Sequence, residues 1–280
     1  MMRSAGLATA VLAVAVLASI ALAPAAALAS QCLAYVQGTP EAMPARFSPV
    51  QANNSQGTDT VEITFVGHAT FRIRSPGGVV IATDYTGHHG AGRVPDVVTM
   101  NHAHSSHYTD VPDPAIEHVL RGWNPQGGQA RHDLEVGDVR IRNVPTDIRG
   151  WSGTVEKHGN SIFIFEMADL CIGHLGHLHH TLSREDLALI GRLDVVFAPV
   201  DGRYTMNVAA MVDVLEDLRA SLVIPMHFFG GASLAQFVGA LTETFELRVA
   251  RDSPIRVSLA SLPRTPTVLI PQGYGGALPQ

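Results

Sequence analysis

The chain has 280 residues, of which 46% are apolar and 16% charged, and its mean hydropathy is +0.16. This composition supplies a large core and excludes a disordered chain, and the formal charge of −6 argues against nucleic acid as a partner. The 14 histidines are the unusual feature, and only their positions can show whether they converge on a metal ion.

An uncharged run rich in Ala, Val and Leu follows Arg3 and ends at Ala27-Leu28-Ala29. Small residues at the end of such a run are typical of a secretory signal peptide, so we expect residues 1–29 to be removed and the protein to be periplasmic or secreted. The run is longer than most signal cores, which leaves an uncleaved membrane anchor as the alternative. Cys32 and Cys171 could form a disulfide in an oxidising compartment, or Cys171 could be a buried apolar side chain.

Residues 30–60 are polar and contain three prolines without a periodic pattern, and we interpret them as an N-terminal arm. Strand patterns then follow in quick succession, and the turn at Pro76-Gly77-Gly78 predicts an antiparallel meander. The expected strands lie at residues 61–66, 69–74, 79–83, 97–100, 139–144, 161–166, 194–198 and 222–224.

Helices are expected between and after the later strands. A capping pattern that starts at Ser183 predicts a helix ending near Gly191, and the same pattern starts again at Ser233. Apolar residues at helical spacing within residues 208–220 predict a further helix. This order predicts an α/β fold with packed sheets and helices outside, in a single domain that spans residues 61–280.

The strand at residues 97–100 runs directly into Asn101-His102-Ala103-His104-Ser105-Ser106-His107. Residues two apart on extended backbone point the same way, so His102 and His104 can reach one ion and His107 can reach a neighbouring position. Two further apolar strands end in histidines, within residues 174–180 and at His227. Because functional loops gather where strands end, we expect these histidines to form one cluster.

The histidine loop resembles the His-x-His-x-Asp-His signature of the metallo-β-lactamase superfamily. Other segments resemble the branch that includes ascorbate-phosphate lactonases and an N-acyl phosphatidylethanolamine phospholipase D. They are Gly67-His68-Ala69-Thr70, Thr83-Asp84-Tyr85, Pro199-Val200-Asp201-Gly202 and Ile224-Pro225-Met226-His227. The resemblance covers roughly residues 61–230 and implies a four-layer αββα sandwich.

Carried onto this chain, the family pattern implies a first zinc site of His102, His104 and His174, and a second site that includes His107 and His227. Zinc held by three imidazoles keeps a fourth position for water, whose pKa falls to about 7. The resemblance therefore implies a zinc-dependent hydrolase, in which metal-bound hydroxide attacks an ester, lactone, amide or phosphodiester.

Both aspartates of the family's metal site are replaced, one by Ser106 and the other by His177. Carboxylate ligands normally offset the repulsion between two dications. We therefore expect a well-occupied first site and a weak second site of His107, His177 and His227. His68 is expected to brace its loop rather than to bind metal.

Ser106 and His180 are the candidate catalytic residues. Ser106 stands where the family has a carboxylate, and His179 and His180 could carry protons, with solvent exposure as the alternative for this pair. Asp147 and Asp201 are candidates for a missing carboxylate.

The loss of both aspartates favours an alternative function, a metal-binding or sensing protein that kept the scaffold and lost the chemistry. A purely structural interaction protein without metal is a third possibility. We expect a small-molecule or lipid-like substrate, and contact with a membrane only through the N-terminal segment if it is uncleaved.

Overall fold

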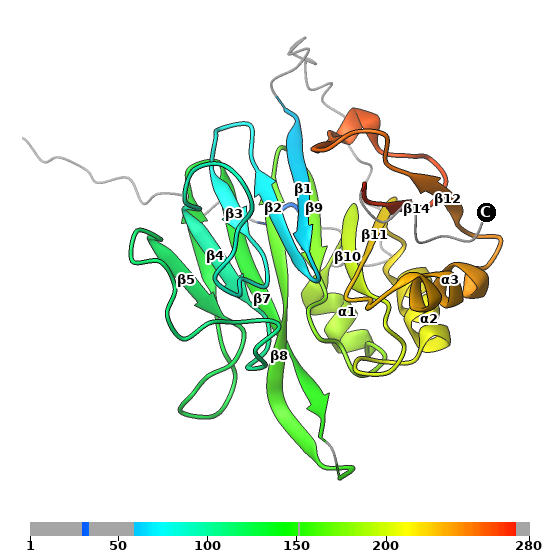
Figure 1. Cartoon of the computed structure of the whole chain (residues 1–280), viewed down its shortest axis with the longest axis horizontal. Helices are drawn as coiled ribbons and strands as arrows, with labels where there is room; N and C mark the ends of the chain where they lie inside the picture. The colour runs from blue at the N-terminus through cyan, green and yellow to red at the C-terminus, as the bar shows by residue number, and fades with distance from the viewer. Residues whose placement is uncertain (1–29, 34–58, 151, 273–280) are drawn as a thin grey trace, which may run out of the picture.

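The computed structural model of the chain describes residues 30–33, 59–150 and 152–272, which form two β-sheets and three α-helices (Figure 1). The predicted signal peptide, residues 1–29, lies outside these residues, as do residues 34–58 of the predicted arm. Within the described residues, no helix combines the length and apolar character needed to span a membrane.

The first sheet has six strands in the order β13-β1-β2-β3-β4-β5. They are β1 (Val61–Gly67), β2 (Thr70–Arg74), β3 (Val80–Ala82), β4 (Val97–Met100), β5 (His118–Arg121) and β13 (Ile255–Val257). β1, β2 and β3 form the predicted antiparallel meander, and β4 and β5 then add in parallel to β3. As a result β1, β3, β4 and β5 all run in one direction, and their C-terminal ends share one edge of the sheet.

The second sheet has eight strands in the order β12-β14-β11-β10-β9-β8-β7-β6. They are β6 (Asp133–Val136), β7 (Val139–Arg149), β8 (Val155–Met167), β9 (Leu170–His174), β10 (Val195–Pro199), β11 (Leu222–Met226), β12 (Glu246–Val249) and β14 (Thr267–Ile270). β9, β10 and β11 are parallel neighbours. All of their residues are buried, because the sheet is covered on both faces.

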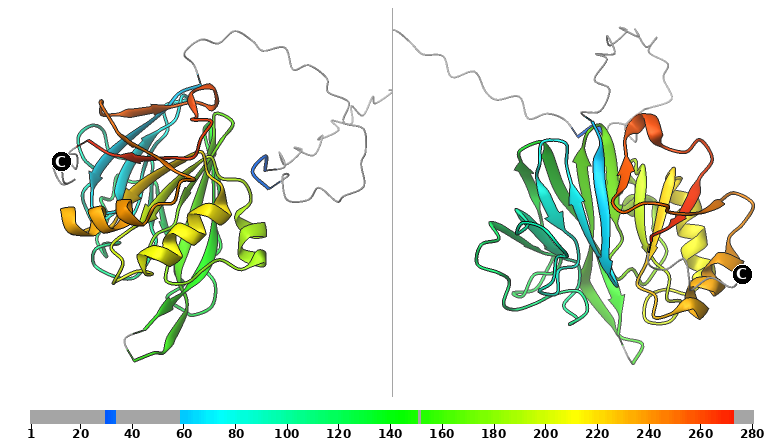
Figure 2. Two further views of the ribbon diagram at one scale, coloured as in Figure 1. Left: turned by 90° about the vertical axis from the view of Figure 1, so that its right-hand side faces the viewer. Right: turned by 45° about the horizontal axis from the view of Figure 1, so that its top comes forward.

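Two large apolar clusters hold these layers together. One lies between the sheets and includes Phe71, Phe163 and Phe197. The other lies between the eight-stranded sheet and the helices. The helices are α1 (Arg184–Ile190), α2 (Val208–Leu218) and α3 (Gly231–Ala240), with a short 3-10 turn η1 (Leu259–Ser261). These layers confirm the predicted α/β class with two packed sheets (Figure 2).

The outer face of the six-stranded sheet departs from the four-layer expectation. In the described residues all three α-helices contribute to the cluster on the eight-stranded sheet. On the six-stranded sheet, Ala82, Val98 and Met100 pack instead against Tyr85 and Ile116, which come from loops. Loops therefore form the fourth layer here.

The capping signals had different outcomes. Ser183 caps α1 with a complete capping box, and the C-cap is Gly191, both as predicted. The predicted cap at Ser233 is wrong, because α3 begins at Gly231 and its N-cap, Gly230, makes no side-chain capping bond. The hydroxyl of Ser233 instead donates to the carbonyl of Gly230.

Candidate metal centre

Six loops meet at one edge, where parallel strands of both sheets end. Three of them follow β1, β3 and β4 of the six-stranded sheet, and three follow β9, β10 and β11 of the eight-stranded sheet. The backbone N–H of His227 donates to the carbonyl of His68 over 2.9 Å and joins the two sheets at this edge. His68, Asp84 and His227 have positive φ angles of 50°, 43° and 54°, so the chain turns sharply after β1, β3 and β11. The fold thus brings side chains from both sheets to one place.

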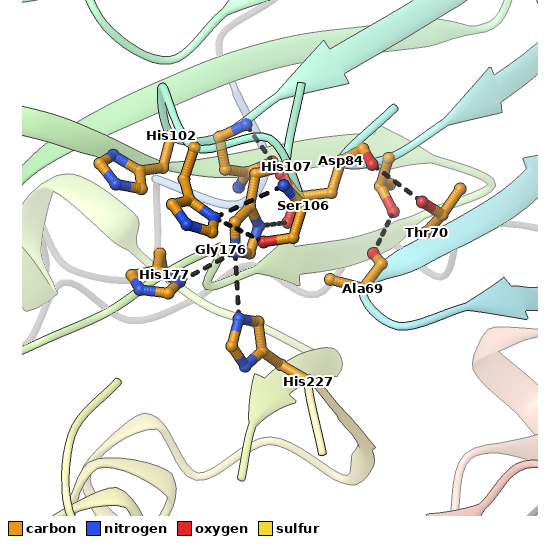
Figure 3. Close-up of polar contacts among 12 residues, drawn as sticks. Ala69, Thr70, Asp84, His102, Ser106, His107, Gly176, His177 and His227 are labelled. Atoms are coloured by element: carbon orange, nitrogen blue, oxygen red, sulfur yellow. Dashed lines mark hydrogen bonds and ion pairs between the residues drawn. The ribbon is translucent and has the colours of Figure 1, made fainter. Parts of the chain in front are cut away.

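Six imidazoles gather at this edge, and we call them the histidine cluster. They are His68, His102, His104, His107, His177 and His227. His107 is central: its Nε2 lies 3.0 Å from Nε2 of His227 and 2.9 Å from Nδ1 of His177. The ring centroids of His102 and His104 lie 6.2 and 6.3 Å from that of His107. Figure 3 shows His107 between His177 and His227, with dashed lines to both.

A buried carboxylate holds His107 in one orientation. Asp84, which has no exposed surface, accepts hydrogen bonds from the backbone N–H of Asn101 over 2.8 Å and from Nδ1 of His107 over 2.7 Å (Figure 3). Because Nδ1 carries the proton, the lone pair of His107 is at Nε2, which faces the cluster. This carboxylate–imidazole pair is typical of histidines that bind metal.

A second carboxylate lies beside His227. Oδ2 of Asp201 lies 3.0 Å from Nδ1 of His227. Burial acts to raise the pKa of Asp201, but the contact with His227 and the hydrogen bonds from Thr205 and the backbone of Arg203 outweigh it, so this pKa lies well below its usual range. Asp201 is therefore an anion in contact with the imidazole of His227.

The residues present fit a divalent metal ion. His68, His107 and His227 each offer a nitrogen, and these atoms lie within 4.8 Å of one another. Nε2 of His68 is buried and has no hydrogen-bond partner, so one donor atom is unused by the protein. The anionic Asp201 faces an imidazole rather than Lys or Arg, which leaves negative charge for a cation to balance.

Burial keeps four imidazoles of the cluster neutral, which is the state in which imidazole binds metal. Burial lowers the pKa of His68 to about 4, and electrostatic repulsion by His227 adds to this effect. Burial likewise lowers the pKa of His102, and it lowers those of His107 and His177 far below the usual value of 6.5. At neutral pH these four imidazoles therefore have lone pairs available.

The structure does not assemble the first site predicted from the sequence. Both nitrogens of His174 are engaged: Nε2 donates to the carbonyl of Ala69 over 2.9 Å, and Nδ1 accepts from the backbone N–H of Gly176 over 3.2 Å. Its ring packs beside Phe71 and Phe197 in the core between the sheets. The prediction of His174 as a ligand is therefore corrected: it is a core histidine that supports the loop before His177.

The second predicted set, His107, His177 and His227, is brought together, with ring centroids between 4.7 and 4.9 Å apart. His102 and His104 also join the cluster, but without His174. His68 corrects a further expectation. Its carbonyl does brace the loop, yet its imidazole lies 4.1 Å, centroid to centroid, from that of His227. The same signal, a histidine directly after a strand, marked this residue in the sequence.

The two candidate catalytic residues occupy different positions. Ser106 shares a hydrogen bond of 2.8 Å with Nδ1 of His104, which is exposed, so this serine orients a cluster histidine. His180 lies away from the centre: its Nε2 accepts from the backbone N–H of Asp147, and its Nδ1 donates to the carbonyl of Thr181. It is His179 whose ring lies beside the cluster, 4.8 Å from that of His177.

Gly176 makes the turn that places His177. Its φ is +60°, and a Cβ there would lie 2.5 Å from Oδ1 of Asn160 and 2.6 Å from the side chain of Asn101, both fully buried. The same oxygen of Asn160 accepts the backbone N–H of His177 over 2.8 Å. Only glycine therefore fits this position without moving His177.

Gly176→Ala should destabilise the protein by about 1–3 kcal/mol and weaken its binding of zinc, because the new methyl group strains the turn and displaces His177. Gly127→Ala is the matched control, since Gly127 also has positive φ, +88°, but a methyl group on its Cα would have no atom within 4 Å. Urea unfolding and zinc titration of both variants measure the effect. Equal behaviour of the two would contradict it.

The stability of the metal-free protein should fall as the pH decreases from about 6.5 towards 4. Burial lowers the pKa values of His68 and His179 to about 4, so below 6.5 the unfolded chain takes up protons that the folded protein does not. Above 6.5 neither state is protonated at these rings, and the dependence should vanish. Urea unfolding midpoints at pH 7.5 and pH 5.0 test this. In the His179→Gln variant the midpoint should change less between the two pH values. A midpoint that stays constant would disprove it.

Comparison with known proteins identifies the family. Residues 62–227 match the beta-lactamase superfamily domain, a stretch that covers more than half of the chain and contains the whole histidine cluster. The chain therefore belongs to the β-lactamase superfamily. This confirms the family predicted from the histidine motifs, whereas the finer resemblance to one branch stays a prediction.

Proteins similar to the chain include metal-dependent hydrolases. The chain is 27% identical over 201 residues to a UPF0173 metal-dependent hydrolase of Methanosphaerula palustris. The aligned residues cover 66% of this chain and 92% of the relative. It is 26% identical over 190 residues to the UPF0173 metal-dependent hydrolase PH1671 of Pyrococcus horikoshii, and the aligned residues cover 60% of this chain and 84% of that relative. The predicted class, a metal-dependent hydrolase, is the class of these relatives.

Solved structures agree with the fold. A member of the metallo-β-lactamase superfamily from Thermotoga maritima matches with a TM-score of 0.55 and 25% identity, covering 75% of this chain and 98% of that one. A structure from Parabacteroides distasonis matches with a TM-score of 0.52 and 17% identity. The match covers 65% of this chain and 88% of that one, and it supports the fold alone.

Proposed function

We propose that the protein is an exported zinc-dependent hydrolase whose metal is held by the histidine cluster. One observation carries the proposal: His68, His107 and His227 present nitrogens to a common point, and buried carboxylates stand behind the last two. Carboxylates behind imidazoles are typical of metal sites. Membership of the β-lactamase superfamily supports the same proposal.

The identity of the donors favours zinc. Imidazole suits zinc, copper, iron and nickel, whereas magnesium and calcium prefer oxygen ligands. A zinc ion bound here would supply Lewis acidity and lower the pKa of a coordinated water to about 7. His102, His104 and His177 complete the cluster beside these three histidines.

The protein's own groups have distinct tasks in this proposal. Asp201 places a negative charge beside His227, and Asp84 accepts the Nδ1 proton of His107, so that Nε2 of this second ring stays available. The backbone carbonyl of Gly159 does the same for His102, accepting from its Nδ1 over 2.7 Å. His104 is exposed, so the cluster is open to solvent on this side and a substrate can approach it there.

The substrate class follows from the same chemistry. We propose an ester, lactone, amide or phosphodiester carried by a small or lipid-like molecule, since each has an electrophilic centre next to an oxygen that a metal can polarise. The choice among them depends on loops outside the shared scaffold.

The disulfide supports the proposal of export. Cys32 and Cys171 are bonded, with Cα atoms 5.9 Å apart. Such bonds persist in oxidising compartments and are rare in the cytosol. Export to the periplasm or to the medium agrees with the signal-like run in residues 1–29. An uncleaved anchor, the alternative for that run, would hold the same domain outside the cytoplasm.

Metal content and turnover together test the proposed function. Purified wild-type protein should carry at least one zinc ion and hydrolyse a member of a panel of esters, lactones, amides and phosphodiesters. His107→Ala and His227→Ala should lose both properties, because each removes a nitrogen at the centre of the cluster. His88→Ala, at an exposed loop position, is the control and should keep both.

Two outcomes would contradict the hydrolase. Protein without any transition metal, even after incubation with zinc, would exclude the metal centre. Bound zinc with no turnover, unchanged in Ser106→Asp and His177→Asp variants, would favour the metal-binding or sensing alternative.

A further inference from the structure

Two large aromatic side chains are exposed beside the histidine cluster. Phe229 is 66% exposed and Tyr204 is 58% exposed, and their ring centroids lie 5.4 Å apart with the planes at 69°. They come from the loops after β10 and β11, which are neighbouring parallel strands. Aromatic rings left in water, yet packed edge to face on each other, are a feature of binding surfaces.

Phe229 connects this pair to the metal centre. Its ring centroid lies 5.3 Å from that of His68 and 5.5 Å from that of His227, two of the three imidazoles whose nitrogens converge. A group bound at that point would therefore have the face or edge of Phe229 as a neighbour.

The backbone that carries these rings is held in place by the site itself. Oδ1 of Asp201 accepts the backbone N–H groups of Arg203, Tyr204 and Thr205, while Oδ2 of the same carboxylate faces His227. Phe229 follows His227 by two residues, and the N–H of His227 is bonded to His68. The surface is thus preformed, which lowers the entropy cost of binding.

We propose that Tyr204 and Phe229, which we call the aromatic rim, bind an aromatic ring of the substrate next to its reacting group. The inference rests on the proposed function and adds a substrate class to it. Substrates with an aryl group beside the scissile bond are favoured over those with a methyl group, because stacking and apolar burial act only on the former.

Binding of two small hydroxamates to the zinc-loaded protein tests the rim without turnover. Benzohydroxamate and acetohydroxamate share the same metal-binding group and differ in a phenyl or a methyl substituent. Titration calorimetry should give a dissociation constant at least about 10-fold lower for benzohydroxamate. Phe229→Ala and Tyr204→Ala should remove most of this difference and leave acetohydroxamate unchanged.

Further variants separate the rim from general damage. Phe229→Leu keeps an apolar side chain but has no ring, and it should also lose the preference for benzohydroxamate. Val111→Ala changes another exposed apolar residue, 83% exposed, and should keep the preference. Zinc content is measured for each protein.

The outcomes distinguish a failure of the aromatic rim from a failure of the proposed function. Equal affinity of the wild type for both hydroxamates, or equal losses for both in the rim variants, would overturn the aromatic rim and leave the metal centre standing. Binding of neither compound to zinc-loaded protein would show that the ion has no open position, and would overturn the proposed function together with the rim.

Discussion

Replacing Asp84 with asparagine should lower the affinity of the protein for zinc by about 10- to 100-fold. The carboxylate of Asp84 now accepts the Nδ1 proton of His107. An amide nitrogen in its place would donate to Nδ1 and shift the proton of His107 to Nε2, the atom that faces the cluster.

Competition for zinc with a chelating dye at pH 7.5 measures this loss. Asp201→Asn should weaken binding in the same direction, because it removes a negative charge that lies 3.0 Å from His227. Asp147→Asn is the control: Asp147 pairs with Lys157 and belongs to no histidine of the cluster. If Asp84→Asn bound zinc as tightly as the wild type, the role assigned to Asp84 would be wrong.

Removing the disulfide should cost the protein about 2–5 kcal/mol of unfolding free energy. The bond joins Cys32 to Cys171 across a sequence separation of 139 residues, so its loss frees a long stretch of the unfolded chain. It also fixes residues 30–33 to the domain, where the carbonyl of Cys32 accepts the backbone N–H of Arg192 over 2.9 Å. Both effects act in the same direction.

Urea unfolding of a Cys32→Ala, Cys171→Ala double variant tests this prediction. Ser30→Ala is the matched control, because it removes the hydrogen bond from Ser30 to Glu166 in the same segment but keeps the disulfide. The control should lose no more than about 1 kcal/mol. A double variant as stable as the wild type would show that the bond adds nothing to stability.

Strands that have a buried face and a clear boundary were predictable. β1, β4 and β10 were expected within a residue or so of their ends, because apolar residues dominate each and turn residues or histidines follow. β12 was not expected, since all four of its residues are exposed, and β8 extends before residue 161 through a polar segment. Such strands form through backbone pairing with a neighbour, which leaves little apolar pattern in the sequence.

The sequence by itself determined the family, the α/β class and a cluster of histidines at strand ends, because strand-end motifs are local and their spacing is visible in one chain. Only the tertiary structure decided which imidazoles meet. His174 and His177 are three residues apart in one loop, and the turn at Gly176 directs the second, not the first, to the cluster. The supporting roles of Asp84 and Asp201 depend on contacts across 23 and 26 residues of sequence, which chain packing alone brings within hydrogen-bond distance.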